Sequence, residues 1–242
     1  MTASRKAYFN WSGGKDSALA LYHVLQNKVA DVQLLLTTVN AQVNRVSMHG
    51  VRIELLHIQG ECIGIPIREI RLPETVSMDE YNKIMYQSVN TLVTEEFHHT
   101  IFGDIFLEDL RKYREQQLAP FGLQVHFPLW QRSTKELLNE FLDLGFKTIV
   151  VCVKAILLDQ TFAGRIIDKD FIKDLPSSVD PCGENGEFHT FVFDGPIFKS
   201  PVKFSIGEKV YKEYQAPKNS NDNCFSPNQD SQMGFWYCDL IP

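Results

Sequence analysis

The stretch Ser12-Gly13-Gly14-Lys15-Asp16-Ser17 decides the fold, because it joins a short apolar run to an alanine- and leucine-rich segment. This order predicts a strand over 7–11, a tight glycine turn and a helix over 15–28. Two adjacent glycines let the backbone approach a bulky anion, since neither carries a Cβ. The N–H groups and the positive dipole end of the helix would face that anion, with the Lys15 ammonium beside them. The stretch therefore predicts a polyphosphate site at a helix N-terminus.

Downstream of this stretch, apolar runs alternate with amphipathic segments. They predict strands over 31–39, 66–72, 99–105 and 123–129, and helices over 51–59, 77–97 and 108–121. Ser77 and Glu80 form a capping-box pattern at the start of the second of these helices. The alternation is typical of a doubly wound, mostly parallel, Rossmann-like α/β sheet, whose ligands bind at the carboxyl ends of the strands. Residues 12–17, 37–40 and 103–104 fall at such ends, so we expect them to meet in one crevice.

The pattern changes after Trp130. A helix over 133–144, a strand over 148–153 and a short helix over 171–175 are followed by alternating segments over 188–193, 202–206, 209–214 and 235–241. Residues 215–232 are polar and rich in turn formers, which predicts a loop. We therefore expect two domains, an α/β nucleotide-binding domain over 1–130 and a smaller α+β region over 131–242.

Composition limits the class of protein. The chain has 242 residues, with 24 basic and 30 acidic residues, and no basic cluster, which disfavours a broad nucleic-acid footprint. No apolar run approaches the ~20 residues of a membrane span, and the N-terminus runs straight into the first strand without a secretory signal. The five cysteines are odd in number and lack a CxxC pair, which fits a reducing compartment. We expect a cytoplasmic enzyme without a membrane partner, and leave open whether it forms a homodimer.

A second stretch, Asp180-Pro181-Cys182-Gly183-Glu184-Asn185-Gly186-Glu187-Phe188-His189-Thr190, concentrates carboxylates, a thiol and an imidazole. In a strand starting near Glu187, alternation would place Glu187 and His189 on one face. They could then act as a base with its partner, or as Mg²⁺ and substrate contacts. A polar loop capping a hairpin explains the same composition, and nothing in the sequence indicates a nucleophilic Cys182.

Together, Ser12–Ser17 and Gly183-Glu184-Asn185-Gly186-Glu187-Phe188 resemble the two motifs of the diphthine–ammonia ligase family of PP-loop ATPases. The resemblance extends over roughly residues 6–200. His189-Thr190 departs from the Glu-Thr that usually follows the aromatic residue, and the chain looks more like the compact bacterial branch of the family. Diphthamide is not expected in bacteria, so the acceptor stays open.

The resemblance implies an ATP-dependent carbon–nitrogen ligase that uses Mg²⁺ and forms an adenylate. It implies an unidentified carboxylate acceptor and an ammonia or amine donor. The expected ATP-binding residues are Ser12, Gly13, Gly14, Lys15, Asp16, Ser17, Thr38, Asn40, Met48, His49, Gly103 and Asp104. The expected catalytic residues are Lys15, Asp16 and Glu187, with Asp16 also a Mg²⁺ ligand. The expected substrate-binding residues are Glu184, Asn185, Glu187 and His189.

Two alternatives remain from the sequence. The first is a PP-loop enzyme of tRNA modification or sulfur transfer. The absence of a CxxC pair and of a basic tract counts against this alternative. The second is a non-catalytic adenine-nucleotide-binding module, which leaves the acidic stretch without a role.

Overall fold

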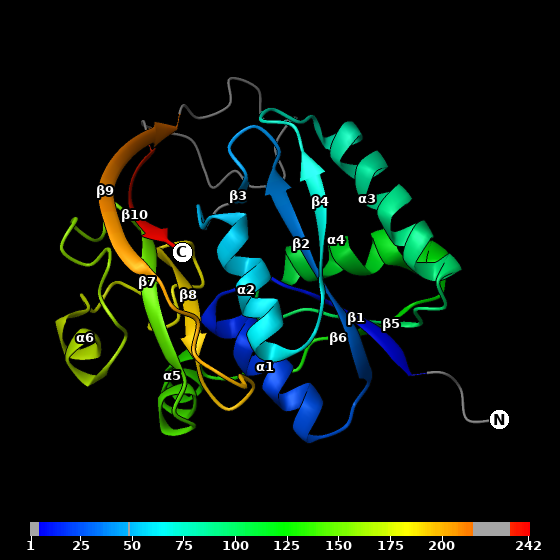
Figure 1. Cartoon of the computed structure of the whole chain (residues 1–242), viewed down its shortest axis with the longest axis horizontal. Helices are drawn as coiled ribbons and strands as arrows, with labels where there is room; N and C mark the ends of the chain where they lie inside the picture. The colour runs from blue at the N-terminus through cyan, green and yellow to red at the C-terminus, as the bar shows by residue number, and fades with distance from the viewer. Residues whose placement is uncertain (1–4, 48, 215–232) are drawn as a thin grey trace.

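The first sheet is mostly parallel and is built in the order β4-β2-β1-β5-β6 (Figure 1). Its strands are β1 (Lys6–Asn10), β2 (Asp31–Asn40), β4 (Ile67–Leu72), β5 (His99–Ile101) and β6 (Gln124–His126). A short strand, β3 (Arg45–Val46), pairs antiparallel with the end of β2. The computed structural model describes residues 5–47, 49–214 and 233–242, so Met48 and the loop expected over 215–232 lie outside the described residues.

Helices cover both faces of this sheet. Phe9 and Leu35 pack with α1 (Lys15–Gln26) and α2 (Ile53–Ile63) on one face. On the other face, Tyr8 and Leu36 pack against α3 (Met78–Thr94), and α4 (Glu108–Leu118) packs beside it, followed by a 3₁₀ turn η1 (Ala119–Phe121). The doubly wound α/β sheet is therefore confirmed.

The second sheet is antiparallel, in the order β8-β7-β10-β9. Its strands are β7 (Lys147–Lys154), β8 (Phe188–Asp194), β9 (Ser205–Tyr214) and β10 (Met233–Ile241), accompanied by α5 (Thr134–Asp143) and α6 (Lys169–Asp174). This is the smaller α+β region that the sequence predicts, with the expected strands over 202–206 and 209–214 merged into the single strand β9.

One buried cluster connects the two sheets. Helices α1 and α2 lie between them (Figure 1), and Phe9, Leu56 and Phe191 are all fully buried in this common core. Each such side chain contributes about 1.5–3 kcal/mol through burial. The core between the sheets is shared, while the face covered by α3 and α4 has its own buried clusters. The domain boundary at residues 130 and 131 stays a prediction.

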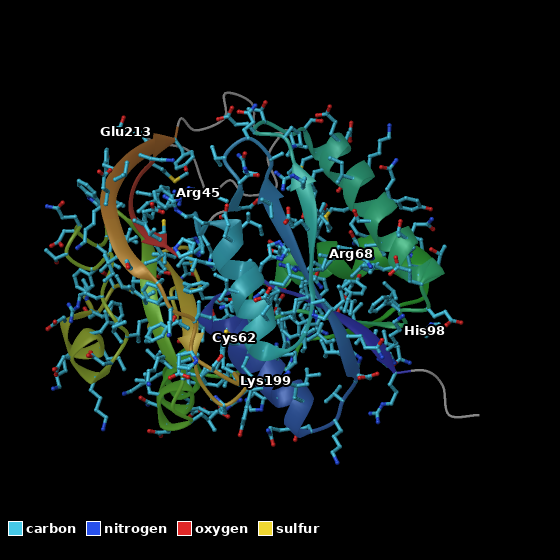
Figure 2. All side chains as sticks on the ribbon, in the orientation of Figure 1. Arg45, Cys62, Arg68, His98, Lys199 and Glu213 are labelled. Atoms are coloured by element: carbon cyan, nitrogen blue, oxygen red, sulfur yellow. The ribbon has the colours of Figure 1, made fainter. Side chains whose placement is uncertain are left out.

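Ion pairs add a second connection between the sheets. Asp239 on β10 accepts hydrogen bonds from Arg45 Nη1 at 2.8 Å and from Arg52 Nη2 at 2.6 Å; Figure 2 labels Arg45. The hydrogen bond from Arg52, with that from Arg45, lowers the pKa of Asp239 to about 2. The carboxylate is therefore ionised wherever the protein is folded near neutral pH.

The predicted helix cap is confirmed, whereas two predicted strand ends are wrong. The Ser77–Glu80 capping box is present, with Glu80 N 3.3 Å from Ser77 Oγ and Ser77 N 3.2 Å from Glu80 Oε2. By contrast, β5 ends at Ile101 and β6 at His126, earlier than predicted, because the chain leaves the sheet to form the loops that reach the second region. Within the described residues, no helix has the length and apolar character needed to cross a membrane.

Candidate nucleotide and acid–base site

The glycine loop after β1 is held by its backbone conformation and by hydrogen bonds to its two serine hydroxyls. Gly13 has φ +79°, which favours glycine, and Gly14 is the extended N-cap of α1. Ser12 Oγ accepts the Gly14 N–H at 3.2 Å and lies 2.8 Å from Ser17 Oγ. The backbone and hydroxyl groups of the predicted polyphosphate loop therefore gather at the start of α1, where the helix dipole favours negative charge.

Lys15 joins this loop to the second motif. Its side chain is buried, and Nζ donates to both Asp16 oxygens, at 2.9 and 2.7 Å, and to the Cys182 carbonyl. Its backbone N–H donates to Thr190 Oγ1 at 3.0 Å. Burial alone lowers the pKa of Lys15, but Asp16 and Glu184 outweigh it and the net pKa is raised. The site thus contains a permanent cation at the loop.

Glu184 supplies a titratable group beside that cation. Its Oε1 accepts the Ile105 N–H at 3.1 Å, which brings the acidic stretch against the loop after β5. Burial, followed by the charge of Asp16, raises the pKa of Glu184 to about 7. A carboxyl group with this pKa exchanges its proton near neutral pH, as a general acid or base must.

Asp104 lies at the same edge of the sheet. Burial raises the pKa of Asp104, and the charge of Asp16 adds to this, although Arg114 Nε lies 3.1 Å from Asp104 Oδ2 and opposes it. Gly103, next to it, packs so closely on α1 that a Cβ would lie 3.1 Å from Ser17 N. The end of β5 therefore meets the first turn of α1, as the topology predicts.

Two imidazoles from different parts of the chain meet above the loop. The ring centroids of His49 and His189 are 4.7 Å apart, and His49 Nδ1 donates to the Thr190 carbonyl at 3.1 Å. A Cβ on Gly14 would lie 3.0 Å from His49 Cε1, so this ring packs on the loop. Burial lowers the pKa of His49 to about 4 and that of His189 well below its ordinary value. Both rings are neutral at pH 7.

Glu187 and Asn185 build the acidic loop itself. Glu187 is buried and accepts hydrogen bonds from Asp180 N at 3.0 Å, Asn185 N at 2.8 Å and Asn185 Nδ2 at 3.1 Å. These hydrogen bonds give the Glu187 carboxylate a structural role in shaping the loop. The catalytic role expected for Glu187, and the substrate contact expected for Asn185, stay predictions.

At the end of β2, Thr37 is a better candidate for ligand contact than the predicted Thr38 and Asn40. Asn40 Oδ1 accepts from Gln42 N and Val43 N, at 3.0 and 3.3 Å, and so shapes a turn, while the Thr38 carbonyl accepts from Ser47 N. Thr37, which lies on the Leu35 side of the strand, is buried with its hydroxyl unpartnered among the described residues. Such a hydroxyl needs an explanation, and a ligand is one. Thr37 belongs to the stretch 37–40 expected at this strand end, but residue type and spacing did not distinguish it from Thr38 and Asn40.

Gln59 is the other residue that sequence reasoning missed. It lies on α2, fully buried, and contacts Trp11, the Gly13 carbonyl and the Val192 carbonyl. In the sequence it appears as one polar residue in an amphipathic helix, so only its burial could identify it.

Cys182 has no features of a nucleophile. Its thiol donates to the Thr134 carbonyl at 3.2 Å, and burial raises the pKa of Cys182 to about 12. The thiolate is the reactive form, so this residue is inert at neutral pH.

No three of the described His, Cys, Asp and Glu side chains are arranged to hold a metal ion. Mg²⁺ commonly takes one or two carboxylates and completes its shell with phosphate oxygens and water. Asp16, whose side chain is 28% exposed at the loop, and Glu184 fit that pattern. The assignment of Asp16 as a Mg²⁺ ligand stays a prediction.

Comparison with known proteins places these motifs in one family. The model of the diphthamide synthase N-terminal domain matches residues 5–124, and that of the diphthamide synthase C-terminal domain matches residues 133–219. The diphthine–ammonia ligases of Bos taurus and Homo sapiens are each 26% identical over 223 residues, covering 82% of this chain and 82% of theirs. The diphthine–ammonia ligase of Schizosaccharomyces pombe is 26% identical over 235 residues, but the chain spans only 38% of that protein's length.

Solved structures resemble the chain more distantly. A predicted subunit of tRNA methyltransferase from Methanocaldococcus jannaschii matches 60% of this chain and 80% of its own, with a TM-score of 0.41 and 15% identity. The U34-tRNA thiolase NcsA from Methanococcus maripaludis matches 60% of this chain and 59% of its own, with a TM-score of 0.39 and 17% identity. Likenesses at this level carry no argument about function. Matched in order by both domain models over most of its length, the chain belongs to the diphthamide synthase family.

Proposed function

We propose that this protein is an ATP-dependent carbon–nitrogen ligase that activates a carboxylate as an acyl adenylate and transfers it to ammonia or an amine. The observation that carries the proposal is the position of Lys15. Its ammonium contacts Asp16 in the glycine loop and the Cys182 carbonyl in the acidic stretch, so the two motifs form one site. The diphthine–ammonia ligases at 26% identity support ATP use and ammonia as the nitrogen donor.

In the first step, a carboxylate oxygen of the acceptor attacks the α-phosphorus of ATP. The bond from the α-phosphorus to the bridging oxygen breaks, and pyrophosphate leaves with that oxygen. The Lys15 ammonium and the positive end of the α1 dipole stabilise the negative charge that develops. Mg²⁺, with Asp16 among its ligands, would supply further charge neutralisation.

In the second step, the amine nitrogen attacks the acyl carbon and AMP leaves with the electron pair of the broken C–O bond. Ammonium must lose a proton before it can attack. Glu184, with its pKa near 7, is suited to accept that proton. His189 and Asn185 lie on the acceptor side in this proposal.

The protein is proposed to act in the cytoplasm. The described cysteines, Cys62, Cys152, Cys182 and Cys238, are all free, which fits a reducing compartment.

The test is product analysis with ATP labelled at the α-phosphate, Mg²⁺, ammonium and a panel of carboxylates. Labelled AMP with pyrophosphate is the expected product, and labelled ADP would refute the adenylation chemistry. Lys15→Met should lower AMP formation by about 100-fold or more, as loss of a charge-stabilising donor does. ATP binding without turnover across the whole panel would favour a nucleotide-binding module instead.

A further inference from the structure

We propose that Gln59 is a positioning residue that fixes the Gly13–Gly14 peptide plane, so that the Gly14 N–H faces the phosphates, and that couples this plane to β8. The inference rests on the proposed function, since it takes the glycine loop as the ATP phosphate site. Gln59 is not part of that loop in sequence, being 46 positions from Gly13.

The Gly13 carbonyl has two donors. Gln59 Nε2 donates to it at 3.1 Å and Val192 N at 2.9 Å. A trans peptide is planar, so its C=O and the following N–H point in opposite directions. Holding the Gly13 oxygen toward α2 and β8 therefore turns the Gly14 N–H away from them, where it donates to Ser12 Oγ at 3.2 Å. A phosphate oxygen would take the place of that hydroxyl as the acceptor. Glycine pairs have many accessible conformations, so this plane needs external contacts to be fixed.

The Gln59 amide is itself held in one orientation. Oε1 accepts the Trp11 indole N–H at 2.7 Å, and Nε2 gives its second hydrogen to the Val192 carbonyl at 2.6 Å. Exchanging the oxygen and nitrogen would set an oxygen against two carbonyls, so only one assignment satisfies all the partners. Gln59 is 0% exposed, so water cannot replace these bonds.

The same contacts extend to the second region. Val192 both donates to Gly13 and accepts from Gln59, and it lies two residues after Thr190 on β8. A shift of β8 would therefore move the loop peptide, and a rotated loop peptide would strain β8. The nucleotide loop and the strand that carries His189 and Thr190 behave as one unit.

The experiment compares two ligands that differ in phosphate. Dissociation constants for ATP and for adenosine are measured by calorimetry on the full chain and on Gln59→Met, which keeps the size but loses the amide. We expect the ATP constant to rise about tenfold, the effect of one to two hydrogen bonds, with the adenosine constant unchanged. The ratio of the two constants separates phosphate positioning from general loss of structure.

The matched control is Ile63→Ala, which removes a buried side chain from the same helix without touching the loop. It should lower stability and leave the ratio unchanged. Trp11→Phe removes the bond to Oε1 together with part of a buried ring, and it should raise the ratio by about twofold to threefold. This variant tests the inference if Gln59→Met fails to fold.

Equal weakening of both ligands, or an unchanged ATP constant in Gln59→Met, would overturn the inference while leaving the proposed function in place. Failure of the wild-type chain to prefer ATP over adenosine would instead overturn the phosphate-loop assignment, and the role of Gln59 with it.

Discussion

The hydroxyl of Thr190 accepts the backbone N–H of Lys15 at 3.0 Å, although the two residues are 175 positions apart. The first N–H of a helix has no partner within the helix, and here a strand of the second sheet supplies one. Helix α1 is therefore capped by a strand of the second sheet, and its N-terminus is complete only when β8 is in place.

Replacing Thr190 with Val should remove this cap and keep the shape of the side chain. We expect a loss of about 1 kcal/mol in the free energy of unfolding, typical for a lost cap, and weaker ATP binding. Urea unfolding and calorimetry measure the two effects. Thr148→Val is the control, because its buried hydroxyl donates to the Phe191 carbonyl at 2.9 Å. It should cost similar stability, and an equal loss of ATP affinity there would contradict the prediction.

Glu184 should set the pH dependence of amide formation. Its pKa is raised to about 7, and the base must be ionised to take a proton from ammonium, so the rate should rise as pH increases through about 7. Glu184→Gln should abolish this rise in rate with pH. Rates are measured from pH 5.5 to 8.5 at a constant ammonium concentration. A rise that persists in the variant would show that another group titrates.

The raised pKa of Glu184 also predicts how the stability of the fold depends on pH. Because the folded pKa of Glu184 lies above its ordinary value of 4.5, the folded state holds the proton more tightly, and stability falls as pH rises from about 4.5 to 7. Glu184→Gln has no charge to form. It should therefore be more stable than the wild type above pH 7, with the difference shrinking toward pH 4.5. Urea midpoints across this range test it.

The histidine pair should make the fold sensitive to acid. The pKa of His49 is lowered to about 4 and that of His189 well below its ordinary value, so the unfolded chain binds more protons between pH 6.5 and about 4. The contribution of these two histidines to stability is then full above pH 6.5 and is lost as pH decreases through this window. His189→Gln should flatten the fall. His57→Gln, with its ring paired to Glu69 on the surface, is the control. Equal flattening in both would refute the assignment.

Thr37→Val should separate ligand binding from stability. The buried hydroxyl of Thr37 has no partner among the described residues, so replacing it by a methyl group should leave the melting temperature unchanged or higher. If the hydroxyl binds the nucleotide, the ATP dissociation constant should rise about threefold to tenfold. Thr38→Val, on the opposite face of β2, provides the comparison. A lower melting temperature in Thr37→Val would mean that the hydroxyl already has a partner.

Much of the fold follows from local pattern. The Ser77–Glu80 capping box, the glycine turn at Gly13 and the alternation of strands and helices depend on residues a few positions apart, and the spacing of such residues records backbone periodicity directly. The carboxyl-end position of the glycine loop and of Gly103-Asp104 follows from the parallel topology in turn.

The contacts that define the site were decided by tertiary structure. The sequence by itself determined a parallel α/β sheet with an anion-binding loop at a helix N-terminus, because these depend on short-range spacing. Only the packing of the second sheet on α1 and α2 placed Thr190 on Lys15, brought the rings of His49 and His189 together and buried Gln59 against Gly13. It also directed the Glu187 side chain toward Asp180 and Asn185 of its own loop. Alternation along a strand had predicted a position beside His189 instead. Side-chain direction outside regular strands depends on which buried polar groups need partners, and that is settled only when distant segments meet.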